Sequence, residues 1–167
     1  MWAKKQTGIN RIFLSRPVVE AGEKIGFLPG MIQDKLDPYM RPYYDCLHDM
    51  VGAEAYQDKL HKGFIEIAPL AFMRGRNLQN CFVILDEAQN ATFEQITMLL
   101  TRLCDNVKLV VCGDPYQSDI NGKSGLCRMV DAMTGVPDIG ITRFEKRDVV
   151  RSEIVRNVLE ALDRFED

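Results

Sequence analysis

The sequence predicts a three-layer α/β fold, in which helices cover both faces of a mostly parallel β-sheet. Short apolar runs rich in β-branched residues recur along the chain, separated by longer helical or irregular stretches. Two of these runs, residues 82–85 and 108–112, have the two-sided apolar character of central parallel strands that lie beneath helices. An amphipathic segment separates the two runs, and a strand–helix–strand order implies parallel pairing.

Four such runs are expected to form strands, and a fifth run has a weaker pattern. Arg16-Pro17 stops the first run, Pro69 stops the second, and Gly113-Asp114-Pro115 ends the fourth. The five expected strands are residues 11–15, 64–68, 82–85, 108–112 and 139–144.

Three amphipathic helices are expected between and after the later strands. The first follows Thr92, which can cap it, and Gln95 stands three residues later, as in a capping box. The second covers residues 124–133, and Gly135 follows it as a stop signal. The third covers residues 152–165, with apolar residues at helical spacing.

The stretch from residue 18 to residue 63 has a different character. Glycines and a proline punctuate its start, which predicts a long ordered loop. Asp37-Pro38 is expected to begin a helix, and Pro42 is expected to shorten or kink it. A further helix is expected over residues 53–62, closed by Gly63. Three tyrosines of this stretch are expected to pack between helices rather than stack on bases: Tyr39, Tyr43 and Tyr44.

The bulk composition is that of an ordinary soluble globular protein with one domain, residues 1–167. No apolar run approaches the roughly 20 residues that cross a bilayer, and no signal peptide is evident, so we expect a cytoplasmic location. The five cysteines form no CxxC pair, which indicates reduced thiols. The net charge of −3 argues against coating nucleic acid by bulk charge, although a local basic groove stays open.

Two adjacent acids, Asp86 and Glu87, directly follow the third apolar run. Carboxylates at the carboxyl end of a parallel strand lie in the crevice where α/β proteins bind ligands. This is the Walker B pattern, in which the Asp holds Mg2+ through water and the Glu polarises an attacking water. Taken alone, the pattern is equally compatible with a strand that ends in a solvated acidic turn.

A second polar motif, GDPYQ at residues 113–117, follows the next strand. A strand ending in DEAQ, an amphipathic helix and a strand ending in GDxxQ together resemble the core of superfamily 1 helicases and related ATPases. In those proteins the glutamine, here Gln117, lies near the terminal phosphate. The two motifs at this spacing favour a nucleotide site over two unrelated turns.

Longer motifs extend this resemblance over residues 11–155. The chain contains, in order, FLSRPVVEAGEKIGFLPG, KLDPYMRPYYDCL, IEIAPLAFMRGRNLQNCFVILDEAQN, LTRL, GDPYQSDI with KSGL, and DVVRSEIV. In this order they resemble the PhoH-like ATPases. The resemblance implies a P-loop NTPase fold with ATP and Mg2+ as cofactors. It also implies that Asp86 binds the metal through water, that Glu87 activates water, and that Gln117 senses the terminal phosphate, supported by Gln89 and Asp114.

The phosphate-binding half of such a site is missing from these motifs. A P-loop has the pattern GxxxxGK followed by Ser or Thr, and the ten residues before Arg11 do not contain it. Asn121-Gly122-Lys123-Ser124 matches only the end of the pattern, and we expect it simply to begin a helix. In the family the P-loop strand lies between the strands that end in DE and GD. Without it, those two strands pair directly, leave a slot, or accept a strand from another chain.

Five arginines are further candidates for contacts with ligands. Arg16 directly follows the first strand and could reach phosphate. Arg147 and Arg151 flank residues 148–150, where either could act as an arginine finger or belong to a solvated basic face. Arg74 and Arg76 precede the DE strand, where a nucleic-acid contact and a solvated turn are equally compatible with the sequence.

The resulting hypothesis is an ancestral Mg2+-dependent ATP hydrolase, with RNA as its candidate substrate, whose isolated chain hydrolyses ATP poorly or not at all. The rival hypothesis is a non-catalytic remnant that binds RNA or a partner through its arginine-bearing loops. A third is one half of a split ATPase, completed by a P-loop-bearing complementing chain. A homo-oligomer is a further partner hypothesis, and no membrane partner is expected.

Overall fold

The structure, a computed structural model, describes residues 8–18, 32–120, 124–145, 148 and 150–166. Its contacts divide the chain into two compact units, Met1–Met133 and Thr134–Asp167, and each is described by itself. The single domain expected from the sequence stays a prediction. No helix in the described ranges combines the length and the hydropathy that a membrane span requires.

Four parallel strands form the sheet of the first unit, in the order β2-β1-β3-β4. They are β1 (Arg11–Arg16), β2 (Ile65–Pro69), β3 (Cys81–Leu85) and β4 (Val107–Val111). The positions of the first four expected strands and their parallel pairing are therefore confirmed. The central place expected for residues 108–112 is not, because β4 ends the described sheet and Lys108 and Val110 are exposed. Of the three arrangements considered for the DE and GD strands, the structure shows direct pairing of β3 with β4.

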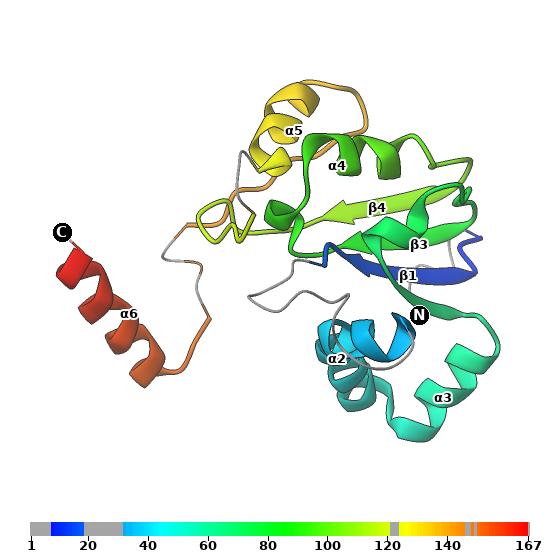
Figure 1. The fold of residues 1–167 in the computed structure, drawn as a ribbon, viewed down its shortest axis with the longest axis horizontal. Coiled ribbons are helices and arrows are strands. Elements are labelled where there is room, and N and C mark those ends of the chain that lie inside the picture. Colours follow the sequence, from blue (N-terminus) through cyan, green and yellow to red (C-terminus); the bar gives the residue numbers. More distant parts are fainter. Residues whose placement is uncertain (1–7, 19–31, 121–123, 146–147, 149, 167) are drawn as a thin grey trace. The chain divides into compact units, whose positions relative to one another are not determined.

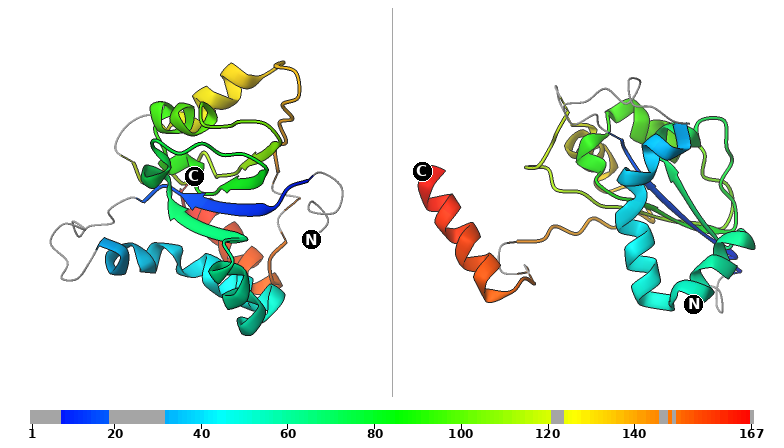
Figure 2. Two further views of the ribbon diagram at one scale, coloured as in Figure 1. Left: turned by 90° about the vertical axis from the view of Figure 1, so that its right-hand side faces the viewer. Right: turned by 60° about the horizontal axis from the view of Figure 1, so that its bottom comes forward.

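The helices of this unit lie on both faces of the sheet, which confirms the three-layer α/β fold. Figures 1 and 2 show α4 (Phe93–Leu100) and α5 (Gly125–Met133) on one face. On the other face lie α2 (Ile32–Val51) and α3 (Ala53–His61). The main apolar core includes β3, the short 3-10 helix η2 (Leu70–Met73) and the inner sides of α4 and α5. Its most buried side chains include Phe13, Leu70, Met73, Leu78, Val83, Leu85, Ile96 and Leu99.

The capping box that the sequence predicts at the start of α4 is confirmed. The Thr92 hydroxyl accepts a hydrogen bond from the Gln95 backbone N–H at 3.3 Å, and the Gln95 side-chain oxygen accepts from the Thr92 N–H at 2.9 Å. Two of the four N–H groups that a helix leaves unpaired at its start are thereby satisfied.

The prediction for the start of α2 is wrong. The helix begins at Ile32, so Pro38 and Pro42 both lie within it, and it is not shortened at Pro42 but continues to Val51. A proline inside a helix removes one backbone hydrogen bond. Tertiary packing offsets that loss here, because Met40 is buried and α2 packs against α3 and β2.

The second unit contains α6 (Glu153–Glu166), which confirms the third expected helix. The strand expected at residues 139–144 is wrong, because this segment has no regular secondary structure and its side chains are exposed. Its alternating apolar residues have no neighbouring strand to pair with in the described part of this unit. The apolar side chains of α6 are also exposed, among them Ile154, Val158, Leu159, Leu162 and Phe165.

Candidate functional site

Three strands bring polar residues to the same edge of the sheet. The register pairs Ser15 with Leu85, and Leu85 with Val111, so the residues that follow β1, β3 and β4 emerge together. Backbone hydrogen bonds continue this alignment, from Asp86 N to Ser15 O and from Cys112 N to Leu85 O, both at 2.9 Å. The acids of the DE motif therefore project from a firmly paired strand end, between its two neighbours.

The Asp86 carboxylate lies between a phenol and a thiol. Tyr43, from α2, donates a hydrogen bond to Asp86 Oδ2 and is equally close to the Ser15 carbonyl oxygen, both at 3.4 Å. The Cys112 Sγ lies 3.3 Å from Asp86 Oδ1. Helix α2 thus contacts this carboxylate across the end of β1.

Burial and the Asp86 charge both suppress ionisation of these two neighbours. Partial burial, followed by the negative charge of Asp86, raises the pKa of the Cys112 thiol to about 12. The same two causes, in the same order, raise the pKa of the Tyr43 phenol above its ordinary value. Both groups are therefore protonated near neutral pH and act as hydrogen-bond donors toward the carboxylate.

Glu87 adopts an unusual backbone conformation, with φ of 53° in the left-handed region. Non-glycine residues rarely adopt this conformation, and where they do it redirects the chain. Here the left-handed conformation of Glu87 turns the chain away from the direction of β3, and the short 3-10 helix η3 (Ala88–Asn90) follows. Glu87 Oε2 accepts a hydrogen bond from Gln89 Nε2 at 2.6 Å, and Arg16 Nη2 lies 4.0 Å from Glu87 Oε1.

Gln89 joins the two motifs. Its side chain is only 2% exposed, and its amide donates to Glu87 while its carbonyl oxygen accepts from the Asp114 backbone N–H at 3.1 Å. Gly113 makes this approach possible, because a Cβ at that position would lie 2.5 Å from Gln89 Oε1 and 2.9 Å from Ala88 N. The glycine of GDPYQ is therefore required by the glutamine of DEAQ.

A second set of hydrogen bonds holds the following loop in place. Asn90 accepts from the Asp119 N–H at 2.7 Å and donates to the Asp119 carboxylate at 3.2 Å. The Ser118 hydroxyl donates to the Gln89 carbonyl oxygen at 3.1 Å. Residues 114–119 are thus attached to η3 at both ends.

Gln117 and Tyr116 lie on the exposed side of this loop. Gln117 Nε2 donates to Asp114 Oδ2 at 2.9 Å, and the Tyr116 N–H donates to Asp114 Oδ1 at 3.0 Å. The Tyr116 side chain is 94% exposed. Asp114 therefore organises the loop, while the Gln117 side chain stays at the surface.

The donor set fits a magnesium ion held mainly by phosphate and water. Mg2+ commonly uses only one or two protein carboxylates beside substrate phosphates. Asp86 supplies such a carboxylate, with Glu87 adjacent to it in the chain. In the described part of the chain, no group of three or more His, Cys, Asp or Glu side chains could enclose a metal by itself. The same part of the chain offers no glycine-rich cradle for phosphates.

Two of the five arginine candidates have hydrogen-bond or ion-pair partners in the described structure. Arg16 is at the sheet edge, where Nη1 also donates to the Tyr39 carbonyl oxygen at 3.2 Å. Arg76 pairs with Glu66 at 2.6 Å and stacks over the Phe13 ring, so its guanidinium is already engaged.

The structure describes two of the other three arginine candidates, Arg74 and Arg151. Arg74 is exposed beside a shallow cavity along α4. Arg151 is exposed in the second unit. Arg147 and the residues 121–123 of the KS-containing segment lie outside the described residues, and α5 begins at Gly125, just after Ser124.

Four residues of the site were not identified from the sequence as ligand-site residues: Tyr43, Asn90, Cys112 and Asp119. Asn90 and Asp119 directly extend the two motifs, as DEAQN and GDPYQSD, and this adjacency was a usable signal. Nothing local to Tyr43 indicates a contact with residue 86, because that contact depends on how α2 packs.

Comparisons with known proteins give consistent matches over nearly the whole chain. A family model described as PhoH-like protein matches residues 1–163. The chain is 47% identical over 164 residues to a PhoH-like protein of Bacillus subtilis, covering 97% of this chain and 51% of that protein. It is 48% identical over 161 residues to a PhoH-like protein of Mycobacterium tuberculosis, covering 95% of this chain and 46% of that protein.

The chain matches the Escherichia coli protein PhoH to a similar extent. It is 46% identical over 159 residues, which cover 92% of this chain and 44% of that protein. The chain therefore spans about half the length of the curated relatives that it matches.

Proposed function

The chain belongs to the PhoH-like protein family, and on that premise we propose that its sheet edge is the metal- and water-binding half of a magnesium–ATP hydrolysis site. Asp86 would hold the water shell of Mg2+, and Glu87 would take up a proton from the attacking water. Gln117 would contact the terminal phosphate. The bound ion would supply charge neutralisation between the phosphates.

One observation carries this proposal: buried Gln89 bridges Glu87 and the Asp114 backbone. A solvated acidic turn would have no need of a buried amide that joins two strand ends. Such a bridge keeps the Glu87 carboxylate oriented toward the carboxyl edge of the sheet, where α/β proteins bind ligands. It also fixes the loop that carries Gln117 relative to that carboxylate.

Ground-state affinity for ATP depends largely on the phosphate cradle, whose backbone amides bind the β and γ oxygens. The described residues supply only the other half of the site. We therefore expect the isolated chain to bind magnesium–ATP weakly and to hydrolyse it poorly. Activity of the longer relatives would require the phosphate-binding part of the protein as well.

Titration of Mg2+, ATP and their complex, followed by amide chemical shifts in NMR spectra, tests the proposed site. Magnesium–ATP should perturb Asp86, Glu87 and Gln117 together. Asp86→Asn should weaken that response by about 10-fold or more, because the carboxylate that orients the metal's water shell is lost. Asp105→Asn is the matched control, since Asp105 is an exposed acid in the turn before β4.

Two outcomes would contradict the proposal. A response that is unchanged in Asp86→Asn would remove the carboxylate from the site, and shifts confined to other residues would place ATP elsewhere. A hydrolysis assay tests the second expectation separately. Magnesium-dependent turnover by the pure chain, abolished by Glu87→Gln, would show that this part of the protein is more active than we propose.

A second candidate function is RNA binding without ATP. It is favoured by Tyr116, whose ring is almost fully exposed on the loop of residues 114–119 and could stack on a base. Salt-dependent RNA binding that persists in Asp86→Ala and falls in Tyr116→Ala would support this function instead. A homo-oligomer and a complementing chain remain proposals that the oligomeric state in solution would test.

A further inference from the structure

The guanidinium of Arg16 lies at the sheet edge beside Glu87. Arg16 is the last residue of β1, and its Nη2 is 4.0 Å from Glu87 Oε1. Successive side chains of a strand point to opposite faces, so Arg16 points away from the buried Ser15 and toward α2. There its Nη1 donates a hydrogen bond to the Tyr39 carbonyl oxygen at 3.2 Å. Arg16 therefore lies between helix α2 and the DE motif.

We propose that Arg16 is a phosphate-binding residue that exchanges its contact with Glu87 for a contact with a phosphate oxygen when magnesium–ATP binds. This inference rests on the proposed hydrolysis site and adds a regulation to it. Glu87 Oε1 would be released only after a phosphate group has reached the site. Three observations support the exchange.

The first observation is that the guanidinium has few partners for its five N–H donors, which form a planar fork that matches phosphate oxygens. One donor meets the Tyr39 carbonyl oxygen, and within the described residues the buried Nε has no hydrogen-bond partner. The 4.0 Å separation of Nη2 from Glu87 is longer than the about 2.7–2.9 Å of a charge-assisted hydrogen bond. The Arg16 side chain is 21% exposed and that of Glu87 is 40% exposed, so an anion that arrives at this edge meets both.

The second observation is that the two carboxylate oxygens of Glu87 have different partners. Oε2 accepts a hydrogen bond from buried Gln89 at 2.6 Å, whereas Oε1 faces Arg16 at the longer distance. The contact with Arg16 is therefore the weaker of the two and is the one that a phosphate can replace. After the exchange, Oε1 would accept a hydrogen bond from the attacking water, while Gln89 keeps the carboxylate oriented.

The third observation is the charge at this edge. Asp86 and Glu87 follow β3, and Asp114 closely follows the neighbouring strand β4. Three carboxylates repel a polyphosphate, and a bound Mg2+ compensates only part of that repulsion. Because the Asp86 N–H donates to the Ser15 carbonyl oxygen at 2.9 Å, the end of β1 lies directly beside these acids. Arg16 therefore supplies positive charge from a position that the sheet fixes.

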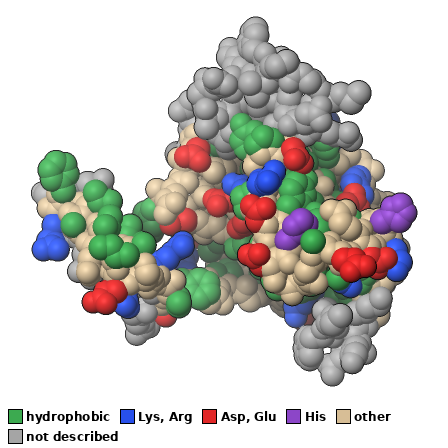
Figure 3. All heavy atoms as spheres, turned by 90° about the horizontal axis from the view of Figure 1, so that it is seen from below, with side chains coloured by type: hydrophobic (Ala, Val, Ile, Leu, Met, Phe, Trp, Pro, Cys, Tyr) green, Lys and Arg blue, Asp and Glu red, His purple; other side chains and the backbone are tan. Residues whose placement is uncertain are grey.

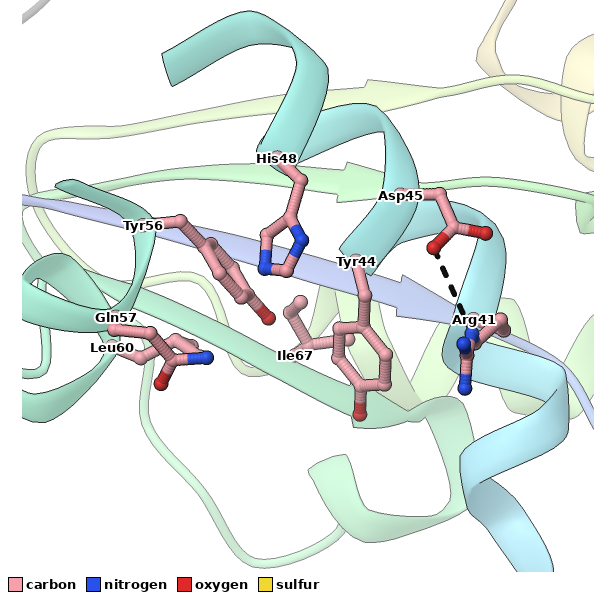
Figure 4. A pocket seen from close by; sticks show the side chains of 8 residues that line it. All are labelled: Arg41, Tyr44, Asp45, His48, Tyr56, Gln57, Leu60 and Ile67. Carbon is pink, nitrogen blue, oxygen red and sulfur yellow. Dashed lines mark ion pairs between the residues drawn. The ribbon is translucent and has the colours of Figure 1, made fainter. Parts of the chain in front are cut away.

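Helix α2, which holds the other end of the guanidinium, is itself held by aromatic packing. Figure 4 shows Tyr44 and His48 of α2 beside Tyr56 of α3, around an open cavity of about 460 Å³. The His48 and Tyr56 rings meet edge-on at 4.6 Å, and Tyr56 is buried. The outer surface on this side of the molecule carries acidic and basic side chains near one another (Figure 3). The inner contacts of α2 therefore fix the Tyr39 carbonyl group that positions Arg16.

NMR spectra of the whole chain without ligand test the contact between Arg16 and Glu87. In Arg16→Gln, the 13C signal of the Glu87 side-chain carboxylate should shift, because a positive charge 4.0 Å away is removed. Arg11→Gln is the matched control, since Arg11 begins the same strand and donates to the Gln79 carbonyl oxygen at 3.4 Å. This control should leave the Glu87 signal unchanged.

Titration with magnesium–ATP and with magnesium–tripolyphosphate tests the exchange. Both ligands should move the Glu87 carboxylate signal toward its position in ligand-free Arg16→Gln, and Mg2+ alone should not move it in that direction. Arg16→Gln should weaken binding of both ligands about 10-fold, because a charge-assisted contact with phosphate is lost. Arg16→Lys should weaken binding less, since it keeps the charge and loses only the planar fork. Arg11→Gln should bind both ligands as the parent chain does.

Three results would overturn the inference. A Glu87 signal that is unchanged in ligand-free Arg16→Gln would show that the two side chains do not interact. Magnesium–ATP binding that Arg16→Gln leaves intact and Asp86→Asn weakens would remove Arg16 from the site while the proposed hydrolysis site stands. Binding that neither variant weakens would contradict the proposed site and the exchange together. If Arg16→Gln does not fold, Arg16→Lys takes its place, and unchanged binding by that variant would overturn the inference.

Discussion

At the scale of single residues, Gln89 has the most consequential position in the candidate site. Both ends of its amide are used, since Nε2 donates to Glu87 and Oε1 accepts from the Asp114 N–H. Side-chain amides that are buried need such partners, and their partners need them. Gln89 therefore affects both the stability of this edge and the orientation of the Glu87 carboxylate.

Gln89→Ala is expected to destabilise the protein by about 1–3 kcal/mol, because the Asp114 N–H and Glu87 both lose a buried partner. Urea unfolding followed by circular dichroism measures the change. Gln79→Ala is the control, since the Gln79 side chain is exposed, and it should stay within about 0.5 kcal/mol. Equal stability of the two variants would mean that the bridge contributes nothing.

At the scale of elements, the close approach of α5 to α4 depends on one glycine. Gly125 donates its N–H to the Ala91 carbonyl oxygen at 2.9 Å. A Cβ on Gly125 would come closer than 3.0 Å to backbone atoms of Thr92 and Phe93, which no side-chain rotation could relieve. The glycine of the KSGL motif is therefore explained by helix packing.

Gly125→Ala is expected to cost about 1–3 kcal/mol, because α5 must shift away from α4 and lose apolar contacts. Gly140→Ala is the control, since a Cβ there meets nothing within 4 Å. Thermal unfolding of both variants measures the difference. A Gly125→Ala variant as stable as the Gly140→Ala variant would show that α5 can move without penalty.

Two elements were predicted wrongly from local sequence patterns, the start of α2 and a strand at residues 139–144. Asp37-Pro38 has the signature of a helix start, yet α2 already contains both residues. Propensity predicts what a segment does in isolation, and packing against α3 and β2 overrides it here. Residues 139–144 show the converse error, since a strand-like pattern forms no strand without a pairing partner.

At the scale of the whole molecule, three acidic side chains with raised pKa values make the stability of the fold depend on alkaline pH. The pKa of Cys112 rises from 9.0 to about 12 and that of Tyr44 from 10.0 to about 12, while that of Tyr43 also rises. Burial is the largest cause in each case. The folded chain therefore binds these protons more tightly than the unfolded chain does.

These groups should therefore contribute their full stabilisation below their unfolded pKa values, 9.0 for Cys112 and 10.0 for Tyr44. The free energy of unfolding should fall as the pH rises from there toward 12. Urea unfolding at pH 8.0 and at higher pH, up to about 11, measures the slope. Tyr43→Phe removes one titrating group, so its stability should fall less steeply over this range. A parallel decline in the variant and the parent chain would exclude Tyr43 as a contributor.

Much of the fold follows from local sequence patterns. The first four strands, α4 with its capping box, and the ends of α3 and α5 match what periodicity and turn residues predict. The roles predicted for Asp86, Glu87 and Asp114 stay predictions, but the structure does bring the ends of their two strands to the same sheet edge, as the parallel order implies. Tyr43 was not identifiable as a site residue, since its contact with Asp86 spans 43 positions in the sequence.

The sequence by itself determined the positions of the sheet strands, the family, and the motifs that project from one sheet edge. The tertiary structure alone decided that β3 pairs directly with β4, that Gln89 bridges the two motifs, and that an aromatic cavity forms between α2 and α3. The physical reason is the distance along the sequence over which each kind of interaction acts. Hydrophobic period and turn chemistry act over a few residues, whereas a side chain's partners across the sheet are set by how distant elements pack.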